Sequence, residues 1–466
     1  MKSILDLFHR ISNELLTDEK EHPVAPHIPS TELYNTLDLS LKSGPLDEVA
    51  FEKVVRELAF ASTRTATPGF FNQLYGGRNE KAVLGELLSV ILNNSMYTYK
   101  AAGAQVGVEK VILKEVCDTI GWLNNSGGTF AAGGSMTNFM SMLMARDAAG
   151  QKARHQGMQD KMIVYTSKES HYSIPKNAAF CGIGRDNVRY IPTDLEGKIE
   201  LSGLENMIKQ DIAEGGLPMM INLTAGTTVL GAFDPVRAVN EICKKYKIWM
   251  HVDGAYCGSV LFSKKHKHLI DGIELVDSFS FNAHKMLGTP LSCSIIVVKN
   301  KKHLLESFSN DASYLYQTDS DGFNLGQTSL QCGRRNDALK FWTLWKSVGT
   351  DGLEKIVDHL FALADTATEY VRNNEDYTLY SYDETIAVCF NYKGIPARDI
   401  CTLLYEHSEL MVGYGSFKGD EFIRLTTING QNEHQDILNF FSTLEQFVEE
   451  HAYLFEQQLA EQELAV

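Results

Sequence analysis

The sequence lacks a long apolar run, a paired cysteine motif and an excess of basic residues. Its longest apolar-rich stretch, Val83 to Leu92, is too short to span a bilayer. The segment from Met1 to Lys20 has mixed charge and no signal-peptide core. A net charge of -16 argues against nucleic acid and anionic membranes as partners. None of the eight cysteines forms a C-x-x-C pair, so neither disulfides nor structural zinc is expected. We therefore expect a soluble, cytoplasmic protein without a metal.

The chain is long enough for a large core and, on length alone, for about two to three domains. From about residue 127 onward, strand and helix patterns alternate, which predicts an α/β domain with a mostly parallel sheet. We expect a helical N-terminal segment over 1–95, a large domain over 96–345 and a smaller α/β domain over 346–466.

Periodicity and turn signals place the individual elements of this arrangement. Helices are expected at about 81–94, 104–123, 136–149, 201–213, 235–246, 336–348, 352–373, 397–407 and 433–458. Strands are expected at 162–165, 188–192, 218–223, 248–253, 294–298, 385–392 and 421–428, with one more that ends at Lys285.

The stretch from Ser278 to Gly288 is an apolar run that ends in Asn282, His284 and Lys285 before a glycine. Burial lowers the pKa of an amine and keeps part of it neutral and nucleophilic, as a Schiff-base lysine requires. The alternative is that Lys285 ends a strand and reaches for solvent.

A second polar feature, Gly133-Gly134-Ser135, precedes a predicted helix. Two glycines allow close backbone approach, and the N–H groups of a helix N-terminus favour an anion such as phosphate. The alternative is an ordinary turn with Ser135 as the N-cap. The pattern is neither a P-loop nor G-x-G-x-x-G, so nucleotide binding is not favoured.

Asp253 ends another apolar strand, and a buried carboxylate requires a cationic partner. A protonated ring nitrogen, His251 or a metal could supply it. His171 could stack on an aromatic ring, move protons or simply bond to the backbone at a helix start. Thr227-Thr228 could bind a phenolate oxygen or close a turn. A phosphate site, a carboxylate for a ring nitrogen, a stacking imidazole and a Schiff-base lysine together fit pyridoxal phosphate.

These motifs resemble those of the group II pyridoxal-phosphate decarboxylases of fold type I, which act on glutamate, cysteine sulfinate, aspartate and aromatic amino acids. Asn282 to Lys285 resembles the family's N-x-H-K, and His251 to Tyr256 resembles H-V-D-A-A-W, with a matching step of 32 residues from Asp253 to Lys285. The segments at Gly133, Ser170 and Gly226 match as well. The resemblance runs from about Pro68 to the C-terminus.

The resemblance implies an aspartate aminotransferase-like large domain, pyridoxal phosphate as cofactor, and a role for each matching residue. Lys285 would bond the cofactor, Asp253 would face its ring nitrogen, and His171 would stack on its ring. The remaining cofactor contacts would be Gly134, Ser135, Asn282 and His284 at the phosphate, Ala255 beneath the ring and Thr228 at the phenolic oxygen.

Three further residues concern the substrate. Phe71 and Gln73 lie in a segment resembling the F-N-Q-L of the acidic-substrate members, where the glutamine would bind a side-chain carboxylate or sulfinate. Arg424 matches the arginine that holds the substrate α-carboxylate, a bidentate task suited to arginine; alternatively, it is a surface arginine on a strand edge. The resemblance thus implies decarboxylation of an acidic amino acid by a homodimer with shared active sites.

The chain departs from the family pattern at a mobile loop. The family places a tyrosine there that returns a proton to the substrate carbon, and Phe323 occupies the matching position here. Tyr314 or Tyr316 could fill the role instead. Oxidative deamination, transamination, decarboxylation of an aromatic or diamino acid, and a non-catalytic relative that binds the cofactor stay open as alternatives. Tyr256 and Cys257 also replace the usual Trp-Gly.

Overall fold

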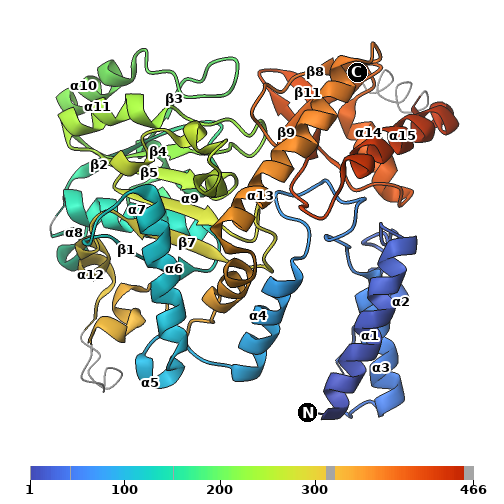
Figure 1. The fold of residues 1–466 in the computed structure, drawn as a ribbon. Helices are drawn as coiled ribbons and strands as arrows, with labels where there is room; N and C mark the ends of the chain where they lie inside the picture. Colours follow the sequence, from blue (N-terminus) through green and yellow to red (C-terminus); the bar gives the residue numbers. More distant parts are fainter. Residues whose placement is uncertain (1, 42, 151, 311–320, 456–466) are drawn as a thin grey trace. The chain divides into compact units, whose positions relative to one another are not determined.

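The computed structural model describes residues 2–41, 43–150, 152–310 and 321–455. They form two compact units (Figure 1). The large unit comprises Arg78–Ala362 and Ser381–Ile386, and the small unit comprises Met1–Gly77, Leu363–Tyr380 and Ala387–Val466. The boundaries expected at residues 95 and 345 stay predictions.

The large unit is built on a seven-stranded sheet with the order β1-β7-β6-β5-β4-β2-β3. Strand β7 is antiparallel to both of its neighbours, and the other neighbouring pairs are parallel. This confirms the predicted mostly parallel sheet. The strands are β1 (Gly127–Ala131), β2 (Lys161–Ser167), β3 (Val188–Ile191), β4 (Gly216–Thr224), β5 (Trp249–Gly254), β6 (Ser278–Asn282) and β7 (Ser294–Val298).

Helices precede, connect and follow these strands. They are α4 (Glu80–Leu92), α5 (Tyr99–Ala102), α6 (Gln105–Ile120), α7 (Gly134–Ala149), α8 (Ala153–Gln156), α9 (Ser173–Phe180), α10 (Leu204–Ala213), α11 (Val236–Tyr246) and α12 (Lys302–Phe308). Helix α13 (Ala338–Arg372) contains one non-helical residue, Gly349, with φ 69°. This break falls between the two helices that the sequence predicts there.

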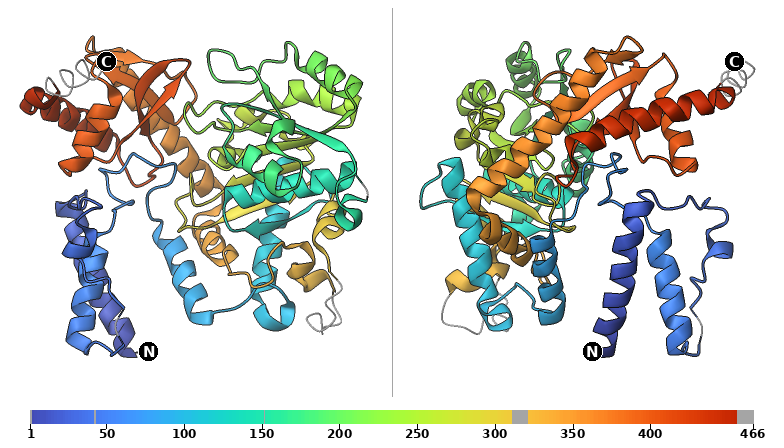
Figure 2. Two further views of the ribbon diagram at one scale, coloured as in Figure 1. Left: turned by 180° about the vertical axis from the view of Figure 1, so that it is seen from behind. Right: turned by 45° about the vertical axis from the view of Figure 1, so that its right-hand side comes forward.

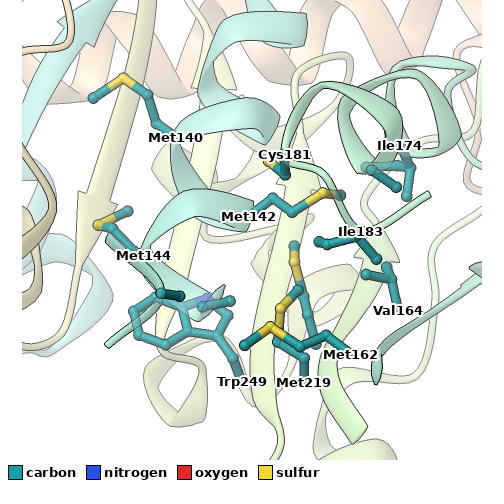
Figure 3. Packing of buried hydrophobic residues seen from close by; sticks show 14 of the residues in the cluster. Met140, Met142, Met144, Met162, Val164, Ile174, Cys181, Ile183, Met219 and Trp249 are labelled. Atoms are coloured by element: carbon teal, nitrogen blue, oxygen red, sulfur yellow. The ribbon is translucent and has the colours of Figure 1, made fainter. Parts of the chain in front are cut away.

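Methionine side chains fill the space between α7 and the sheet. Met140, Met142 and Met144 of α7 belong to one buried cluster with Met162 and Trp249 (Figure 3). Unbranched thioether side chains adapt to irregular gaps, so they pack this interface closely. Helix α7 contacts β4, β5, β6 and β7, which fixes its N-terminal turn over the sheet.

The small unit has an antiparallel sheet with the order β10-β11-β9-β8. Helices α1 and α3 lie side by side in both views of Figure 2 and are joined by the ion pairs Arg10–Glu52 and Arg56–Glu14. Within the described ranges of the chain, no helix has the length and apolar character needed to cross a bilayer. The elements are α1 (Lys2–Glu21), α2 (Leu33–Thr36), α3 (Glu48–Ala61), β8 (Tyr377–Leu379), β9 (Ala387–Tyr392), α14 (Ala397–Glu406), β10 (Gly413–Phe417), β11 (Asp420–Thr426) and α15 (His434–Glu450).

Candidate active site

Two neighbouring strands, β5 and β6, place polar residues on the same face of the sheet. Because side chains alternate along a strand, His251 and Asp253 share a face, and so do Ser278, Ser280 and Asn282. The register pairs His251 with Ser278 and Asp253 with Ser280. All five residues are buried, on the side of the sheet that α7 covers. Burial without water obliges these groups to find protein or ligand partners.

A cavity of about 170 Å³ lies where β4, β5 and β6 end. Ligands of open parallel sheets bind beyond the carboxyl ends of the strands, so the cavity has the expected place. It is lined by all nine predicted cofactor residues: Gly134, Ser135, His171, Thr228, Asp253, Ala255, Asn282, His284 and Lys285. Asn138, Thr224, Gly226 and Tyr256 complete the lining.

The cavity has an end suited to an anion at the start of α7. Gly133 has φ 103°, a left-handed conformation that favours glycine, and the helix begins at the next residue. A Cβ on Gly134 would lie 2.9 Å from the Cβ of Ala255 and 3.1 Å from Nδ2 of Asn282, so a larger residue would disturb the cavity wall. The buried Oδ1 of Asn282 has no partner in the part of the chain that the structure describes. Because an amide oxygen only accepts, an anion would be bound by the N–H groups of the Asn282 Nδ2, which lies beside Gly134.

Asp253 supplies a buried carboxylate, with 3% of its surface exposed. Its Oδ2 accepts a hydrogen bond of 2.6 Å from Nδ2 of Asn138, and its Oδ1 accepts one of 3.0 Å from the N–H of Ala255. His251 is not its cationic partner, because the two ring nitrogens of His251 bond to Ser278 and Asn138. Burial also lowers the pKa of His251 to about 4, which keeps the ring neutral near pH 7.

Lys285 follows β6, lines the cavity and is partly buried. Burial lowers the pKa of its amine, while the nearby Asp253 and Cys257 act in the opposite direction. The Nζ lies 5.8 Å from the centre of the Tyr256 ring. A larger neutral fraction of the amine is what attack on a carbonyl carbon requires.

Two histidines of the cavity are held by hydrogen bonds at Nδ1. His171 Nδ1 lies 2.9 Å from Oγ of Ser173, and His284 Nδ1 accepts a hydrogen bond of 2.8 Å from the N–H of Cys293. Burial lowers the pKa of His171, and it lowers the pKa of His284 to about 3. His284 is therefore neutral near pH 7 and carries its proton on Nε2.

The predicted substrate residues come together in the small unit. Arg424 of β11 donates a hydrogen bond of 2.9 Å from Nη2 to the carbonyl of Asn72, between Phe71 and Gln73. The N–H of Phe71 donates to the carbonyl of Met411 at 2.7 Å, so the segment is held beside the sheet. Phe71 is 1% exposed, whereas Gln73 is exposed. The structure therefore favours a packing role for Phe71 and leaves the Gln73 side chain accessible.

Phe323 does not line the cavity. Its ring lies 5.6 Å from that of Tyr99 and 4.7 Å from the Nζ of Lys110, and the side chain is 38% exposed. Tyr314 and Tyr316, the other candidates for returning a proton, lie outside the described residues. The roles of all three stay predictions.

Asn138 is a cavity residue that motif reading missed. It is buried in α7, three residues after Ser135, and lines the cavity. The sequence carries only a weak indication of this role. Asparagine is unfavourable in a helix interior unless its side chain has a hydrogen-bond partner.

Comparison with known proteins agrees with this geometry. The model of the family described as "Pyridoxal-dependent decarboxylase conserved domain" matches residues 32–393. Mouse cysteine sulfinic acid decarboxylase is 40% identical over 366 residues, covering 77% of this chain and 74% of that protein. The mouse acidic amino acid decarboxylase GADL1 is 35% identical over 433 residues, covering 88% and 78%. The crystal structure described as mouse CSAD superposes with a TM-score of 0.90 at 32% identity, covering 96% of this chain and 99% of that one.

The cavity meets the chemical needs of pyridoxal phosphate. It combines a helix N-terminus for the phosphate, an available amide at Asn282, a buried carboxylate for the ring nitrogen and a lysine whose pKa burial lowers. With the family match over residues 32–393, these features show that the chain belongs to the pyridoxal-dependent decarboxylase family and is a carboxy-lyase that uses pyridoxal phosphate.

Proposed function

We propose that this chain removes CO2 from an acidic L-amino acid (glutamate, aspartate or cysteine sulfinate) and releases the amine. The observation that carries the substrate class is the pairing of Arg424 with the segment that contains Gln73. The names of the relatives, cysteine sulfinic acid decarboxylase and acidic amino acid decarboxylase, support the same class.

Pyridoxal phosphate, when bound, accepts the electrons of the bond that breaks at the substrate carbon. We assign the covalent hold on the cofactor to Lys285 and the charge opposite its ring nitrogen to Asp253. His171 would hold one face of the ring, and Ala255 would leave room on the other. The first turn of α7, with Asn282 and His284, would bind the phosphate. Neutral His284 donates from Nε2, since its Nδ1 accepts from Cys293.

Arg424 and Gln73 are proposed to recognise the two acidic groups of the substrate. A guanidinium group offers parallel N–H donors to the α-carboxylate, which orients the bond that breaks. The neutral amide of Gln73 donates to the side-chain carboxylate or sulfinate. Glutamate and aspartate differ by one methylene, which is worth only about 1–3 kcal/mol in a pocket, so several acidic substrates are expected to react.

A panel of amino acids tests the substrate class. The wild-type enzyme with pyridoxal phosphate is expected to release CO2 from acidic amino acids at least about tenfold faster than from aromatic or basic ones. Gln73→Leu should lower kcat/KM for acidic substrates, because the apolar side chain cannot donate to the second acid group. Fastest release from an aromatic or diamino acid would overturn the proposed class, and no release from any amino acid would favour a non-catalytic relative.

A second outcome of the chemistry follows if Phe323 takes the place of the family's tyrosine, because a phenyl ring has no proton to return to the substrate carbon. In the structure, the Phe323 ring lies against Tyr99 of α5 and Lys110 of α6. Measuring ammonia, aldehyde and hydrogen peroxide beside CO2 and the amine separates oxidative deamination from simple decarboxylation.

A homodimer is proposed because the exterior carries apolar surface that a monomer rarely exposes. In α4, six large apolar residues are between 41% and 56% exposed, and only Ala82, Gly85 and Ser89 are buried. The family resemblance implies that a second copy of the chain covers this apolar surface of α4.

Sedimentation is expected to give twice the mass of one chain at micromolar concentration. Leu88→Lys, on the apolar face of α4, should shift the protein toward monomers and lower activity. Leu195→Lys is the matched control, since Leu195 is 70% exposed outside any helix or strand. A wild-type monomer with full activity would contradict the proposal.

The cytoplasmic location stays a proposal, supported by eight cysteines that form no disulfide; seven of them are buried. Cell fractionation tests it, and recovery of the chain from a secreted fraction would contradict it.

A further inference from the structure

A chain of hydrogen bonds runs under the cavity from β5 and β6 to Asp253. Oγ of Ser278 lies 2.8 Å from Nδ1 of His251, and Nε2 of His251 lies 3.1 Å from Oδ1 of Asn138. Nδ2 of Asn138 then donates to Oδ2 of Asp253 at 2.6 Å and to Oγ of Ser173 at 3.0 Å. The residues come from different parts of the sequence and are all at most 3% exposed.

Each of these hydrogen bonds has only one possible direction. A carboxylate only accepts, so the amide of Asn138 must present its nitrogen to Asp253 and its oxygen to His251. His251 must therefore carry its proton on Nε2, and because the buried ring is neutral, its Nδ1 accepts from Ser278. Because the Ser278 hydroxyl donates its proton to Nδ1 of His251, its oxygen accepts the hydrogen bond of 2.9 Å from the indole N–H of Trp249.

The same amide also fixes the second branch. Ser173 accepts from Asn138, so its hydroxyl proton is left for Nδ1 of His171, at 2.9 Å. The backbone N–H of Ser173 donates to the same ring nitrogen at 3.2 Å. His171 in its neutral form must therefore carry its proton on Nε2.

We propose that Asn138 is a positioning residue that holds the carboxylate of Asp253 in place and, through the Ser173 hydroxyl, supports the same His171 tautomer that the backbone N–H of Ser173 favours. Its amide nitrogen donates to Asp253 and to Ser173, and its amide oxygen accepts from His251. This inference rests on the proposed function, because it matters only if Asp253 and His171 face the cofactor ring.

Among the residues that the structure describes, the titratable groups that face Asp253 come from several elements. They are His251 on the same strand, His171 before α9, Lys285 after β6, and Cys257 after β5, whose thiol interacts with Lys285. A new acid at position 138 would be separated from Asp253 by only 2.6 Å and would dominate these interactions.

Asn138→Asp and Asn138→Leu are therefore expected to differ in their dependence on pH. In Asn138→Asp, two adjoining carboxyl groups cannot both ionise and share a proton with a raised pKa. Below that pKa, the introduced carboxyl donates to Asp253 and still accepts from His251, so affinity for the cofactor recovers as the pH falls. The leucine side chain of Asn138→Leu can neither donate to Asp253 nor accept from His251. This variant should therefore bind the cofactor about 10–100-fold more weakly at every pH.

The dissociation constant of pyridoxal phosphate and kcat/KM are measured between about pH 5 and 8, where folded proteins are generally most stable. Asn240→Asp is the matched control, because Asn240 is 3% exposed and its amide donates to a carboxylate, Glu241, but it does not line the cavity. The affinity of Asn240→Asp for pyridoxal phosphate should match that of the wild-type enzyme at each pH. Ser173→Ala keeps Asn138 and the backbone N–H that donates to His171 and removes only the hydroxyl that links Asn138 to His171, so it should lower kcat without the acid recovery of affinity.

An equal, pH-independent loss in both Asn138 variants would mean a merely structural role and overturn the proposal, as would wild-type affinity in both. If Asn138→Asp does not fold, wild-type affinity in Asn138→Leu would overturn the role at Asp253, and wild-type kcat in Ser173→Ala would overturn the hydroxyl link from Asn138 to His171. Lys285→Ala separates the two levels of inference. If it stays active, the proposed function fails; if it is inactive while the Asn138 variants match wild type, only the role of Asn138 fails.

Discussion

Replacement of Lys285 by alanine is expected to abolish CO2 release and to leave no cofactor adduct that borohydride can trap. Lys285 lines the cavity, and burial lowers the pKa of its amine, so it is the nucleophile available to the cofactor aldehyde. The loss of turnover should be on the order of 10³-fold or more, as when other covalent nucleophiles are removed. In the wild-type enzyme, peptide mapping after reduction should place the cofactor on the peptide that contains Lys285.

Lys267 offers a matched control for this experiment. Burial lowers the pKa of its amine too, but its Nζ donates to the carbonyl of Thr119 at 2.6 Å and it does not line the cavity. Lys267→Ala should retain the adduct and turnover. Lys285→Arg separates charge from nucleophilicity, because it keeps a cation but cannot form the adduct. Turnover in Lys285→Ala, or an adduct at another lysine, would show that the assignment of Lys285 is wrong.

The sheet of the large unit was predictable because several of its strands contain continuous apolar runs. Strands buried on both faces have this composition, and β2, β4 and β7 follow it. Strands β1, β8 and β10 were missed. Strands β1 and β10 each contain two glycines, which weaken the strand pattern, and β8 has only three residues. In β1, a Cβ on Gly128 would lie 2.5 Å from the carbonyl of Ile296, so close backbone approach requires the glycine.

That the residues proposed to hold the cofactor line one cavity was predictable, because each stands at a strand end or helix start with a distinctive residue type. The hydrogen-bond network that joins Asn138, Asp253 and His251 was not predictable from the sequence. Asn138 and Asp253 are 115 positions apart, and no local pattern tells which buried amide meets which carboxylate. Phe71 shows the converse limit, since motif matching assigned it to the substrate, whereas its ring packs 5.1 Å from that of Phe440.

Asp253→Asn is expected to separate covalent capture of the cofactor from catalysis. The substitution keeps the shape of the side chain but removes the charge proposed to face the ring nitrogen. Turnover should fall by about 10²–10³-fold, the cost of removing one preorganised electrostatic partner. The borohydride-trapped adduct should persist, because Lys285 is unchanged, and this contrasts with the expected loss of both in Lys285→Ala.

The same variant gives a pH test whose sign follows from the local charges. The Asp253 carboxylate raises the pKa of Lys285 and of His171, so its removal should lower both. With the pKa of the amine lowered, the neutral form of Lys285 is present at lower pH, and the rate of adduct formation should rise at lower pH than in wild type. Asp277→Asn is the control, since this partly buried carboxylate accepts from the N–H of Met250 and does not line the cavity. If Asp253→Asn retains wild-type turnover and an unshifted pH profile, the carboxylate has no electrostatic role at the cofactor, and the charge opposite the ring nitrogen must come from another group.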